Sequence, residues 1–412
     1  MKEYPKVLLF GHSFNNTTGM GITLTNLFAE WPTKNIAIWS NHIDVSLCET
    51  IRPCERYIGV KHKKVDSIGV KKNRTVKTRL RELIRRLYYK TGIQELISDT
   101  TISLSEVTEA KNFNPDIIFC ALGSSVAMRR CERVMNAIPK AKLVLYIVDD
   151  WVNTKINTRM FSAMWRRKYD KEFRRILNRS SGLLSICQYM SEEYKRIYNK
   201  NFYPFHNPVD LRKWNMLNPV PKYPNGTISI VYMGKINDDT YPCIINLSAV
   251  VKELNEKGNS YVLDIYSPDY SDKAYLFEKI AGTNIYPPIP HEEVATIFKS
   301  YTALFLPLGF SKQSRSYVRL SMPTKLSEYL ASTKPILLNC PDEIALAKYL
   351  KDKNCAILCT DKSFDSLYRS ALQLKDSNNY ENLVNNSQQL AKVHDVGLVR
   401  ERFRSTLNKF KV

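Results

Sequence analysis

The chain has 412 residues, which is too long for one typical hydrophobic core and suits two domains of about 200 residues each. Its 44% apolar and 25% charged residues are typical of a soluble globular protein, and no run approaches the roughly 18 apolar residues that a membrane span requires. The net charge of +21 indicates an anionic partner or a strongly basic surface.

The first residues read as a strand rather than a secretion signal, because the apolar run at 7–10 is short and polar residues follow it at once. The nine cysteines are odd in number and lack paired spacing, and no His or Cys pair completes a zinc site beside Cys355 and Cys359. Free thiols in a reducing cytosol explain this pattern most simply, so we expect a cytoplasmic protein.

Apolar strands alternate with helical patterns along the first half of the chain. The strands are expected at 6–10, 36–39, 117–120, 143–148 and 182–186, and the helices at 21–29, 76–88, 126–137, 161–178 and 188–198. This alternation predicts a parallel sheet flanked by helices.

The segment 61–90 is strongly basic, with twelve Lys and Arg residues against Asp66 and Glu82. Apolar residues recur at helical spacing over 76–88 and the opposite face is basic, which fits an amphipathic helix on an anionic membrane surface. A solvated face over an ordinary core stripe fits equally well, and a second basic run covers 166–179. No helix-turn-helix, zinc-finger or RNA-binding aromatic pattern accompanies the charge, so we expect no nucleic acid partner.

Two loops of the first half follow predicted strands and could contact a ligand. Gly19 and Gly21 permit a tight turn and a close approach to the backbone, although the third glycine of a dinucleotide fingerprint is absent. Asp149 and Asp150 follow the strand at 143–148, where a carboxylate could accept a proton or bind a sugar hydroxyl. The glycine loop is also consistent with a plain strand-to-helix turn, and the aspartate loop with an Asp that caps a helix or forms a turn.

Residues 201–210 contain two prolines together with Asn and Asp, and read as a linker after which the same pattern repeats. Strands are expected at 228–233, 261–266, 303–306, 336–339 and 356–359, and helices at 244–256, 291–299, 325–332 and 344–350. The tail from 380 to 411 is expected to be helical, with a break near 394–397. His12 and His206 lie near the predicted domain edges, where a packed or solvent-exposed role is more typical than a catalytic one.

The segment 321–337 reads as a polar turn, a short helix that Pro323 can begin, and a buried strand. The helix start offers free N–H groups near Thr324 and Lys325, a positive dipole end and a Lys side chain, a combination that binds phosphate. Glu328 follows one turn later and could reach a ribose hydroxyl. An ordinary helix–strand unit of a parallel sheet gives the same pattern.

The motif Ser-x-Pro-Thr-Lys-Leu-x-Glu-Tyr-Leu-Ala at 321–331 resembles the donor-site signature of the family 4 retaining glycosyltransferases. The common form of that signature has two Glu residues separated by seven others. Glu328 matches the second Glu, and Leu320 stands where the first would be. The Asn-Pro-Val-Asp tetrad at 207–210 and the residues around 394–403 are also similar to segments of this family.

The resemblance implies an α/β fold of the GT-B class, with two Rossmann-like domains facing across a cleft. An acceptor-side domain would cover 1–207, a nucleotide-sugar-binding domain 208–390, and a C-terminal helix at 391–412 would return to the first domain. After the strand at 228–233, Gly234 and Lys235 match a family position whose cation contacts the donor diphosphate. A second cation expected a few residues later is absent, and it could be replaced by Lys325, Arg315 or Arg319.

The resemblance also implies retaining transfer of a sugar from a nucleoside-diphosphate sugar, without a metal or a cofactor. Catalytic roles are expected of Asp150, Lys235 and Glu328, and donor binding of Gly19, Gly21, Gly234, Lys235, Thr324, Lys325 and Glu328. The basic first domain suggests a glycan or lipid-linked acceptor for surface polysaccharide, held at the inner face of the cell membrane. A nucleotide-sugar epimerase of the same fold, or a degenerate non-catalytic partner protein, stays open as an alternative.

Overall fold

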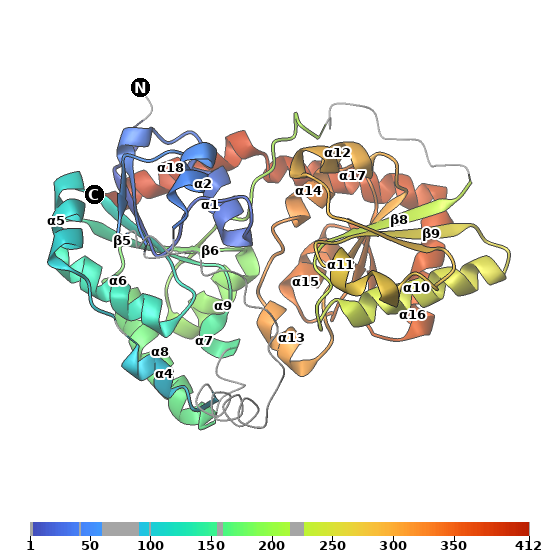
Figure 1. The fold of residues 1–412 in the computed structure, drawn as a ribbon, viewed down its shortest axis with the longest axis horizontal. Helices are drawn as coiled ribbons and strands as arrows, with labels where there is room; N and C mark the ends of the chain where they lie inside the picture. The colour runs from blue at the N-terminus through green and yellow to red at the C-terminus, as the bar shows by residue number, and fades with distance from the viewer. Residues whose placement is uncertain are drawn as a thin grey trace. The chain divides into compact units, whose positions relative to one another are not determined.

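The computed structural model describes residues 3–40, 43–59, 90–98, 100–154, 160–214 and 226–411. The chain forms two compact units (Figure 1). The first unit comprises Met1–Phe205 together with Arg400–Val412, and the second comprises His206–Val399. The predicted helix at 76–88 and most of the basic segment 61–90 lie outside the described residues.

The first unit contains a seven-stranded parallel sheet with the order β3-β2-β1-β4-β5-β6-β7. Its strands are β1 (Val7–Phe10), β2 (Ile36–Trp39), β3 (Arg56–Ile58), β4 (Ile117–Ala121), β5 (Lys142–Ile147), β6 (Gly182–Ser185) and β7 (Tyr203–Pro204). The central strands are continuous apolar runs because both faces of a parallel sheet are covered by helices. The order reverses between β1 and β4, which places the loops after these strands at a topological switch point.

Helices cover both faces of this sheet, and side-chain caps set several of their starts. They are α1 (Gly19–Phe28), α2 (Val45–Ile51), α4 (Ile93–Ile97), α5 (Leu104–Phe113), α6 (Ser125–Ala137), α7 (Trp151–Thr154), α8 (Ser162–Arg179) and α9 (Gln188–Tyr198). Ser103 and Glu106 form a capping box at the start of α5. The last helix, α18 (Val396–Lys411), contributes Phe403 to the core, where its ring meets those of Phe28 and Phe119.

The second unit contains a six-stranded parallel sheet with the order β10-β9-β8-β11-β12-β13. Its strands are β8 (Ile228–Met233), β9 (Tyr261–Tyr266), β10 (Thr283–Tyr286), β11 (Ala303–Pro307), β12 (Ile336–Asn339) and β13 (Ala356–Cys359). Its helices are α10 (Tyr241–Glu256), α11 (Tyr270–Lys273), α12 (His291–Phe298), α13 (Lys312–Val318), α14 (Leu326–Ala331), α15 (Ala345–Asp352), α16 (Phe364–Leu372) and α17 (Ser377–Val393). The order reverses between β8 and β11, so this sheet has a switch point of its own.

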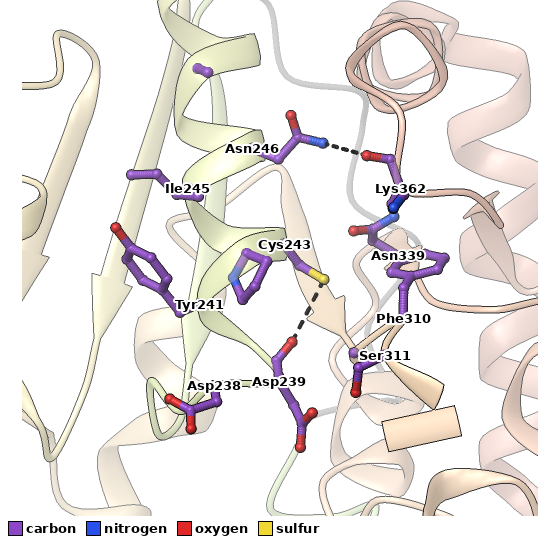
Figure 2. A pocket seen from close by; sticks show the side chains of 13 residues that line it. Asp238, Asp239, Tyr241, Cys243, Ile245, Asn246, Phe310, Ser311, Asn339 and Lys362 are labelled. Atoms are coloured by element: carbon purple, nitrogen blue, oxygen red, sulfur yellow. Dashed lines mark hydrogen bonds between the residues drawn. The ribbon is translucent and has the colours of Figure 1, made fainter. Parts of the chain in front are cut away.

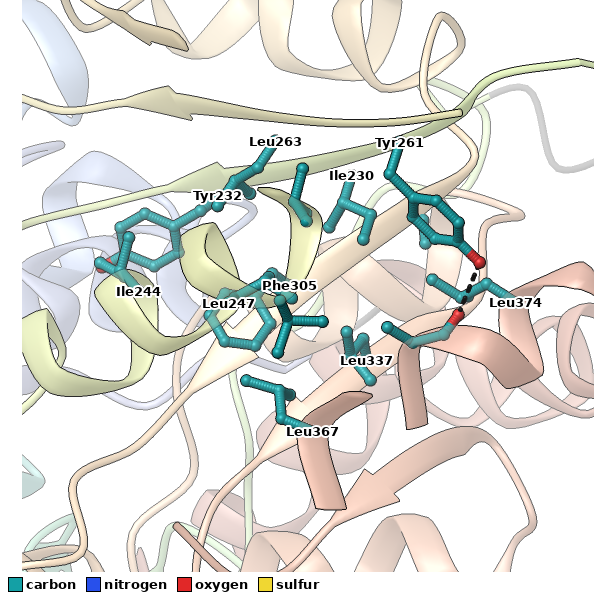
Figure 3. Close-up of a cluster of buried hydrophobic side chains, with 14 of the residues drawn as sticks. Ile230, Tyr232, Ile244, Leu247, Tyr261, Leu263, Phe305, Leu337, Leu367 and Leu374 are labelled. Carbon is teal, nitrogen blue, oxygen red and sulfur yellow. Dashed lines mark hydrogen bonds between the residues drawn. The ribbon is translucent and has the colours of Figure 1, made fainter. Parts of the chain in front are cut away.

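One hydrophobic cluster of the second unit lies between its sheet and the helices α10 and α16 (Figure 3). Leu247 of α10 and Leu367 of α16 pack here against Ile230, Phe305 and Leu337 of the sheet. All five side chains are fully buried. Burial of such side chains contributes roughly 1.5–3 kcal/mol each, which fixes the strand ends that carry the polar loops.

The structure confirms the predicted α/β architecture with two parallel sheets. The break in the C-terminal helical tail is also confirmed, because α17 ends at Val393 and α18 begins at Val396. The sequence did not predict the short strands β3, β7 and β10, which lie at sheet edges and lack a long apolar run. Within the described residues, no helix has the length and apolar character needed to cross a membrane.

Candidate functional site

The loop after β8 is shaped by Gly234, the first residue beyond the carboxyl end of the strand. Gly234 has a φ of +158°, which residues with side chains rarely adopt, and a Cβ atom here would lie 2.9 Å from Tyr232 Oη and 3.2 Å from Lys325 Nζ. A larger residue would therefore displace these two side-chain ends from the backbone. Tyr232 Oη donates to the Lys235 carbonyl at 2.6 Å, and Gly234 N donates to the Tyr266 carbonyl at 3.0 Å. These two hydrogen bonds fix the loop at the carboxyl ends of the strands, where parallel α/β folds bind ligands.

Lys325 brings its ammonium group to the same strand end. Its Nζ donates to the Met233 carbonyl at 3.0 Å and lies 4.9 Å from the centre of the Tyr232 ring and 5.7 Å from that of Tyr329. Burial lowers the pKa of this ammonium to about 8, and the nearby Glu328 carboxylate opposes the shift only in part. The structure thus brings Gly234 and Lys325 together, 91 positions apart in the chain, with a cation poorly compensated by its surroundings.

Lys235 differs from Lys325 in being exposed. No side chain in the described part of the chain pairs with its ammonium group. Of the other cations that could replace the missing second lysine, Arg315 is engaged, since its Nη1 lies 3.0 Å from Glu343 Oε1. Lys325, whose ammonium group reaches the end of β8, is therefore better placed than Arg315.

Thr324 and Lys325 form the turn that leads into α14, which begins at Leu326. Among the residues that the structure describes, no acceptor is found for the backbone N–H groups of Thr324 and Lys325. The Thr324 carbonyl, by contrast, accepts from Asn207 Nδ2 at 3.0 Å. The turn therefore has two N–H groups available to a ligand, while its carbonyl groups are already bonded, and contact of these N–H groups with a diphosphate stays a prediction.

Glu328 is paired with a residue that sequence reasoning missed. Its Oε1 lies 2.8 Å from Nε2 of His291, the first residue of α12. The Glu328 side chain is 17% exposed and that of His291 is 71% exposed, so the histidine covers the acid from the solvent side. This hydrogen bond raises the pKa of His291. The sequence predicted a helix at 291–299 but no role for its first residue, because a His beside two Glu residues at a helix start is no distinct signal.

The two glycines of the first unit have a local structural setting. Gly19 is exposed and is the first residue of α1, whose N-cap Thr18 accepts from Gly21 N at 3.1 Å. A Cβ atom at Gly21 would lie 2.1 Å from Asn15 Nδ2, because the Asn15 carboxamide packs over this position while its oxygen accepts from the loop backbone. A side chain at position 21 would thus displace the Asn15 carboxamide, and contact of Gly19 or Gly21 with a donor stays a prediction.

Asp150 lies directly before α7 and has no exposed surface. Its Oδ1 accepts from Tyr194 Oη at 2.8 Å. This burial favours a structural role, whereas the preceding Asp149 is partly exposed and more accessible to a ligand. A catalytic role for Asp150 stays a prediction that would require this site to open.

A cavity of about 680 Å³ lies in the second unit beside the first turns of α10 (Figure 2). Its lining comes from α10, from the end of β12 and from the loops after β8, β11 and β13, and includes Asp238, Asp239, Asn246, Phe310, Asn339 and Lys362. Lys235, Lys325 and Glu328 do not line it. The residues predicted to contact phosphate and ribose are therefore not part of the lining of this cavity. In the described residues, no group of three or more His, Cys, Asp or Glu is placed to hold a metal ion.

No family model matches the chain, and no curated protein does. Solved structures match it over nearly its whole length. Sucrose-phosphate synthase from Thermosynechococcus elongatus is 9% identical with a TM-score of 0.60, and the match covers 98% of each chain. A TarM variant from S. aureus, in complex with fondaparinux, α-GlcNAc-glycerol and UDP, is 10% identical with a TM-score of 0.57, covering 98% of this chain and 99% of that one.

A putative UDP-N-acetylglucosamine 2-epimerase from Listeria monocytogenes is also similar, at 14% identity and a TM-score of 0.53, covering 98% of this chain and 96% of that one. At these identities the likeness establishes the fold alone. That fold is the GT-B fold, built from two Rossmann-like domains, as the sequence predicted.

Proposed function

We propose that the chain is a glycosyltransferase that moves a sugar from a nucleoside-diphosphate sugar to an acceptor, with retention and without a metal. The observation that carries this proposal is the position of the Lys325 ammonium, held behind Gly234 at the carboxyl end of β8. The exposed Lys235 follows Gly234 in the chain, and Glu328 follows Lys325 in the first turn of α14. Two cations beside a carboxylate suit a diphosphate joined to a ribose.

In this mechanism the lysines act on the leaving group. Negative charge grows on the diphosphate as the bond to the sugar breaks, and a preorganised cation stabilises that charge more in the transition state than in the ground state. Lys325 would bind this charge from within the protein and Lys235 from the solvent side. Glu328 would accept hydrogen bonds from ribose hydroxyls, which requires His291 to share or release the carboxylate.

The likeness to solved structures supports the proposed donor. The S. aureus TarM variant is in complex with UDP, and it has the same fold over the full chain. We extend this to a nucleoside-diphosphate sugar for the present chain because Gly234, Lys235, Lys325 and Glu328 lie in one region of the second unit. Family 4 membership and the retaining outcome are part of the proposal and rest on the motif at 321–331.

The first experiment is a thermal-shift screen with UDP-, GDP- and ADP-sugars. A ligand at 100 times its dissociation constant stabilises the folded state by about 2.7 kcal/mol, which is readily seen as a raised melting temperature. The best ligand is then incubated with candidate acceptors, and the anomeric configuration of the product is read by NMR. A wild-type protein that binds none of the sugar nucleotides would contradict the proposal.

A nucleotide-sugar epimerase is the second candidate, and the structure from Listeria monocytogenes favours it as an alternative. The two activities differ in their products. An epimerase converts the sugar nucleotide without an acceptor, whereas a transferase forms a new glycosidic bond and releases the nucleoside diphosphate. A degenerate, non-catalytic partner protein would give neither product, and it is the reading favoured by Leu320 in place of the first Glu.

The acceptor is proposed to be a glycan or a lipid-linked glycan at an anionic membrane surface on the cytoplasmic side. This proposal rests on the basic segment 61–90 and on the net charge of +21. Replacing Arg79, Arg81, Arg85 and Arg86 by Gln should weaken binding to vesicles that contain anionic lipid, most strongly at low salt. Equal binding of the two proteins would refute membrane attachment and leave the donor site untouched.

A further inference from the structure

His206 is the first residue of the second unit and lies against the turn that precedes α14. Its side chain is buried, and Nε2 lies 3.1 Å from the Pro323 carbonyl. A carbonyl oxygen only accepts, so the proton of the imidazole must be on Nε2. Nδ1 is buried and has no hydrogen-bond partner in the described chain, and burial lowers the pKa of His206 to about 4. The ring is thus a neutral donor with one fixed direction at physiological pH.

Asn207 binds the same turn through both its side chain and its backbone carbonyl. Its Nδ2 donates to the Thr324 carbonyl at 3.0 Å, and its own carbonyl accepts from Ser327 Oγ at 2.7 Å. Asn207 is 1% exposed and Ser327 is fully buried, so water competes little for these bonds. Two consecutive residues therefore hold the segment 323–327 at three points. We refer to His206 and Asn207 as the brace.

Peptide geometry determines the direction in which the N–H groups of the braced turn point. In a trans peptide the C=O of one residue and the N–H of the next are in one plane and point opposite ways. The bonded carbonyls of Pro323 and Thr324 share their planes with the N–H groups of Thr324 and Lys325. Those two N–H groups therefore point away from the brace, and they have no acceptor among the described residues.

The side chains proposed to bind the donor lie within the braced segment or directly after it. Lys325 lies within it and reaches Met233 at the end of β8, and Glu328 follows three residues later and meets His291. A rotation of the Thr324 peptide would move Lys325 Nζ, because its anchor at the Met233 carbonyl is a single hydrogen bond. The brace thus controls the part of the site that the α14 helix, with six residues, is too short to fix by itself.

We propose that His206 and Asn207 are positioning residues, which hold the turn 323–327 so that Lys325, Glu328 and two backbone N–H groups face the donor diphosphate and ribose. This inference rests on the proposed function. Neither residue needs to touch the donor. Their effect passes through the carbonyl groups of Pro323 and Thr324 and the hydroxyl of Ser327.

The brace has a neighbour that provides a matched control. The His206 ring packs edge-on against His394, with the ring centres 5.3 Å apart, and Tyr349 Oη lies 2.8 Å from His394 Nε2. Tyr349→Phe removes a hydrogen bond from this cluster without removing any bond to the turn. It therefore tests whether a small loss of stability near His206 is enough to weaken donor binding.

The experiment measures affinity for UDP and for inorganic pyrophosphate by calorimetry at pH 7.5, with the melting temperature of each variant. His206→Leu removes the donor to Pro323, and His206→Gln restores an N–H donor on a side chain of similar reach. We expect His206→Leu to weaken binding of both probes at least about tenfold, and His206→Gln to recover most of the loss. Tyr349→Phe should lower the melting temperature slightly and leave both affinities unchanged.

If His206→Leu does not fold, Ser327→Ala tests the brace in its place, because it removes only one hydroxyl group of the braced segment. It should weaken binding about threefold. Unchanged affinity in His206→Leu, or in Ser327→Ala, would overturn the brace while leaving the proposed function intact. An equal loss in Tyr349→Phe would also overturn it, by showing a merely structural effect. A wild-type protein that binds neither probe, nor GDP or ADP, would instead overturn the proposed function and the brace with it.

Discussion

Lys325, which we propose binds the donor diphosphate, illustrates the cost in stability of burying a charged group. An ammonium group loses hydration when it is buried, and here one backbone carbonyl and two aromatic rings replace only part of that hydration. The pKa of about 8 reflects this incomplete compensation. An anion bound beside Gly234 would complete this compensation, which is why we propose that the diphosphate binds at this position.

Lys325→Met should therefore weaken binding of UDP or pyrophosphate about tenfold or more, while the melting temperature stays unchanged or rises. Methionine fills a similar volume and removes the desolvated charge. Lys334→Met is the matched control, because Lys334 is also buried with a lowered pKa and donates to a backbone carbonyl, that of Lys299, at 3.0 Å. Lys334 precedes β12 and so lies at the amino ends of the parallel strands, whereas Lys325 reaches the carboxyl end of β8. The Lys334 variant should therefore bind normally. Equal losses in the two variants would contradict the assignment.

His291 should make nucleotide affinity depend on pH. Its pKa is raised by the hydrogen bond to Glu328, so the imidazolium–carboxylate pair is fully formed below about pH 6.5 and is lost as the pH rises through the raised pKa. Lys213 and Glu292 are the other charged groups that act on this histidine. A ribose must compete with the pair for Glu328, so UDP affinity should increase from pH 6 towards pH 8.

The measurement is calorimetric titration with UDP across this pH range in the wild type and in His291→Gln. The variant should lack the increase, since glutamine does not titrate. Pyrophosphate serves as the internal control because it has no ribose and should not sense His291. Above pH 8 the affinity for pyrophosphate should fall, because the ammonium group of Lys325 loses its proton in the free protein. A pH profile that is the same for the two proteins would rule out competition at Glu328.

At the scale of elements, the segment that opens the second unit couples folding to the protonation of His206. Its pKa is lowered to about 4, so the unfolded chain binds this proton more tightly than the folded one. The neutral ring gives its full contribution above about pH 6.5, and that contribution is lost as the pH falls from 6.5 to 4. The 2.5-unit interval corresponds to about 3 kcal/mol.

Chemical denaturation of the wild type and of His206→Gln at several pH values would measure this coupling. The stability difference between the two proteins should shift by about 3 kcal/mol in favour of the variant as the pH falls from 7 to 4. His12, whose pKa is also lowered by burial, lies in the first unit and is present in both proteins, so its effect cancels. A difference that stays constant with pH would show that His206 titrates normally.

The elements also show what the sequence could reveal. Strands such as β8 and β12 were predictable because apolar runs of four to six residues are bounded by Gly or Pro. The turn at 323–325 and Glu328 were identified from a local motif. The contacts of His206 and Asn207 with that turn could not be, because they join residues 117 positions apart through backbone carbonyl groups, which carry no side-chain signature. The pairing of His291 with Glu328 was hidden for another reason: it joins two side chains 37 positions apart, and nothing in the local sequence of either one marks the other as its partner.

At the scale of the whole molecule, the chain passes between its two units twice, after Phe205 and after Val399. The second passage occurs within α18, whose last residues complete the core of the first unit. Phe403 is fully buried there, and its ring contacts those of Trp31 and Phe205 as well as Phe28 and Phe119. The stability of the first unit therefore depends on the final residues of the described chain.

Two cores of this kind should unfold as separate units, and Phe403→Ala tests this. Loss of a buried Phe costs about 3–5 kcal/mol, so the variant should lower the melting temperature of the first unit by several degrees. UDP should still raise the transition of the second unit by the wild-type amount in differential scanning calorimetry, because Lys325 and Glu328 belong to that unit. Phe277→Ala is the matched control, since Phe277 is fully buried in the core of the second unit and its loss should lower the UDP-sensitive transition instead. A single transition that both substitutions lower equally would show that the two cores unfold as one.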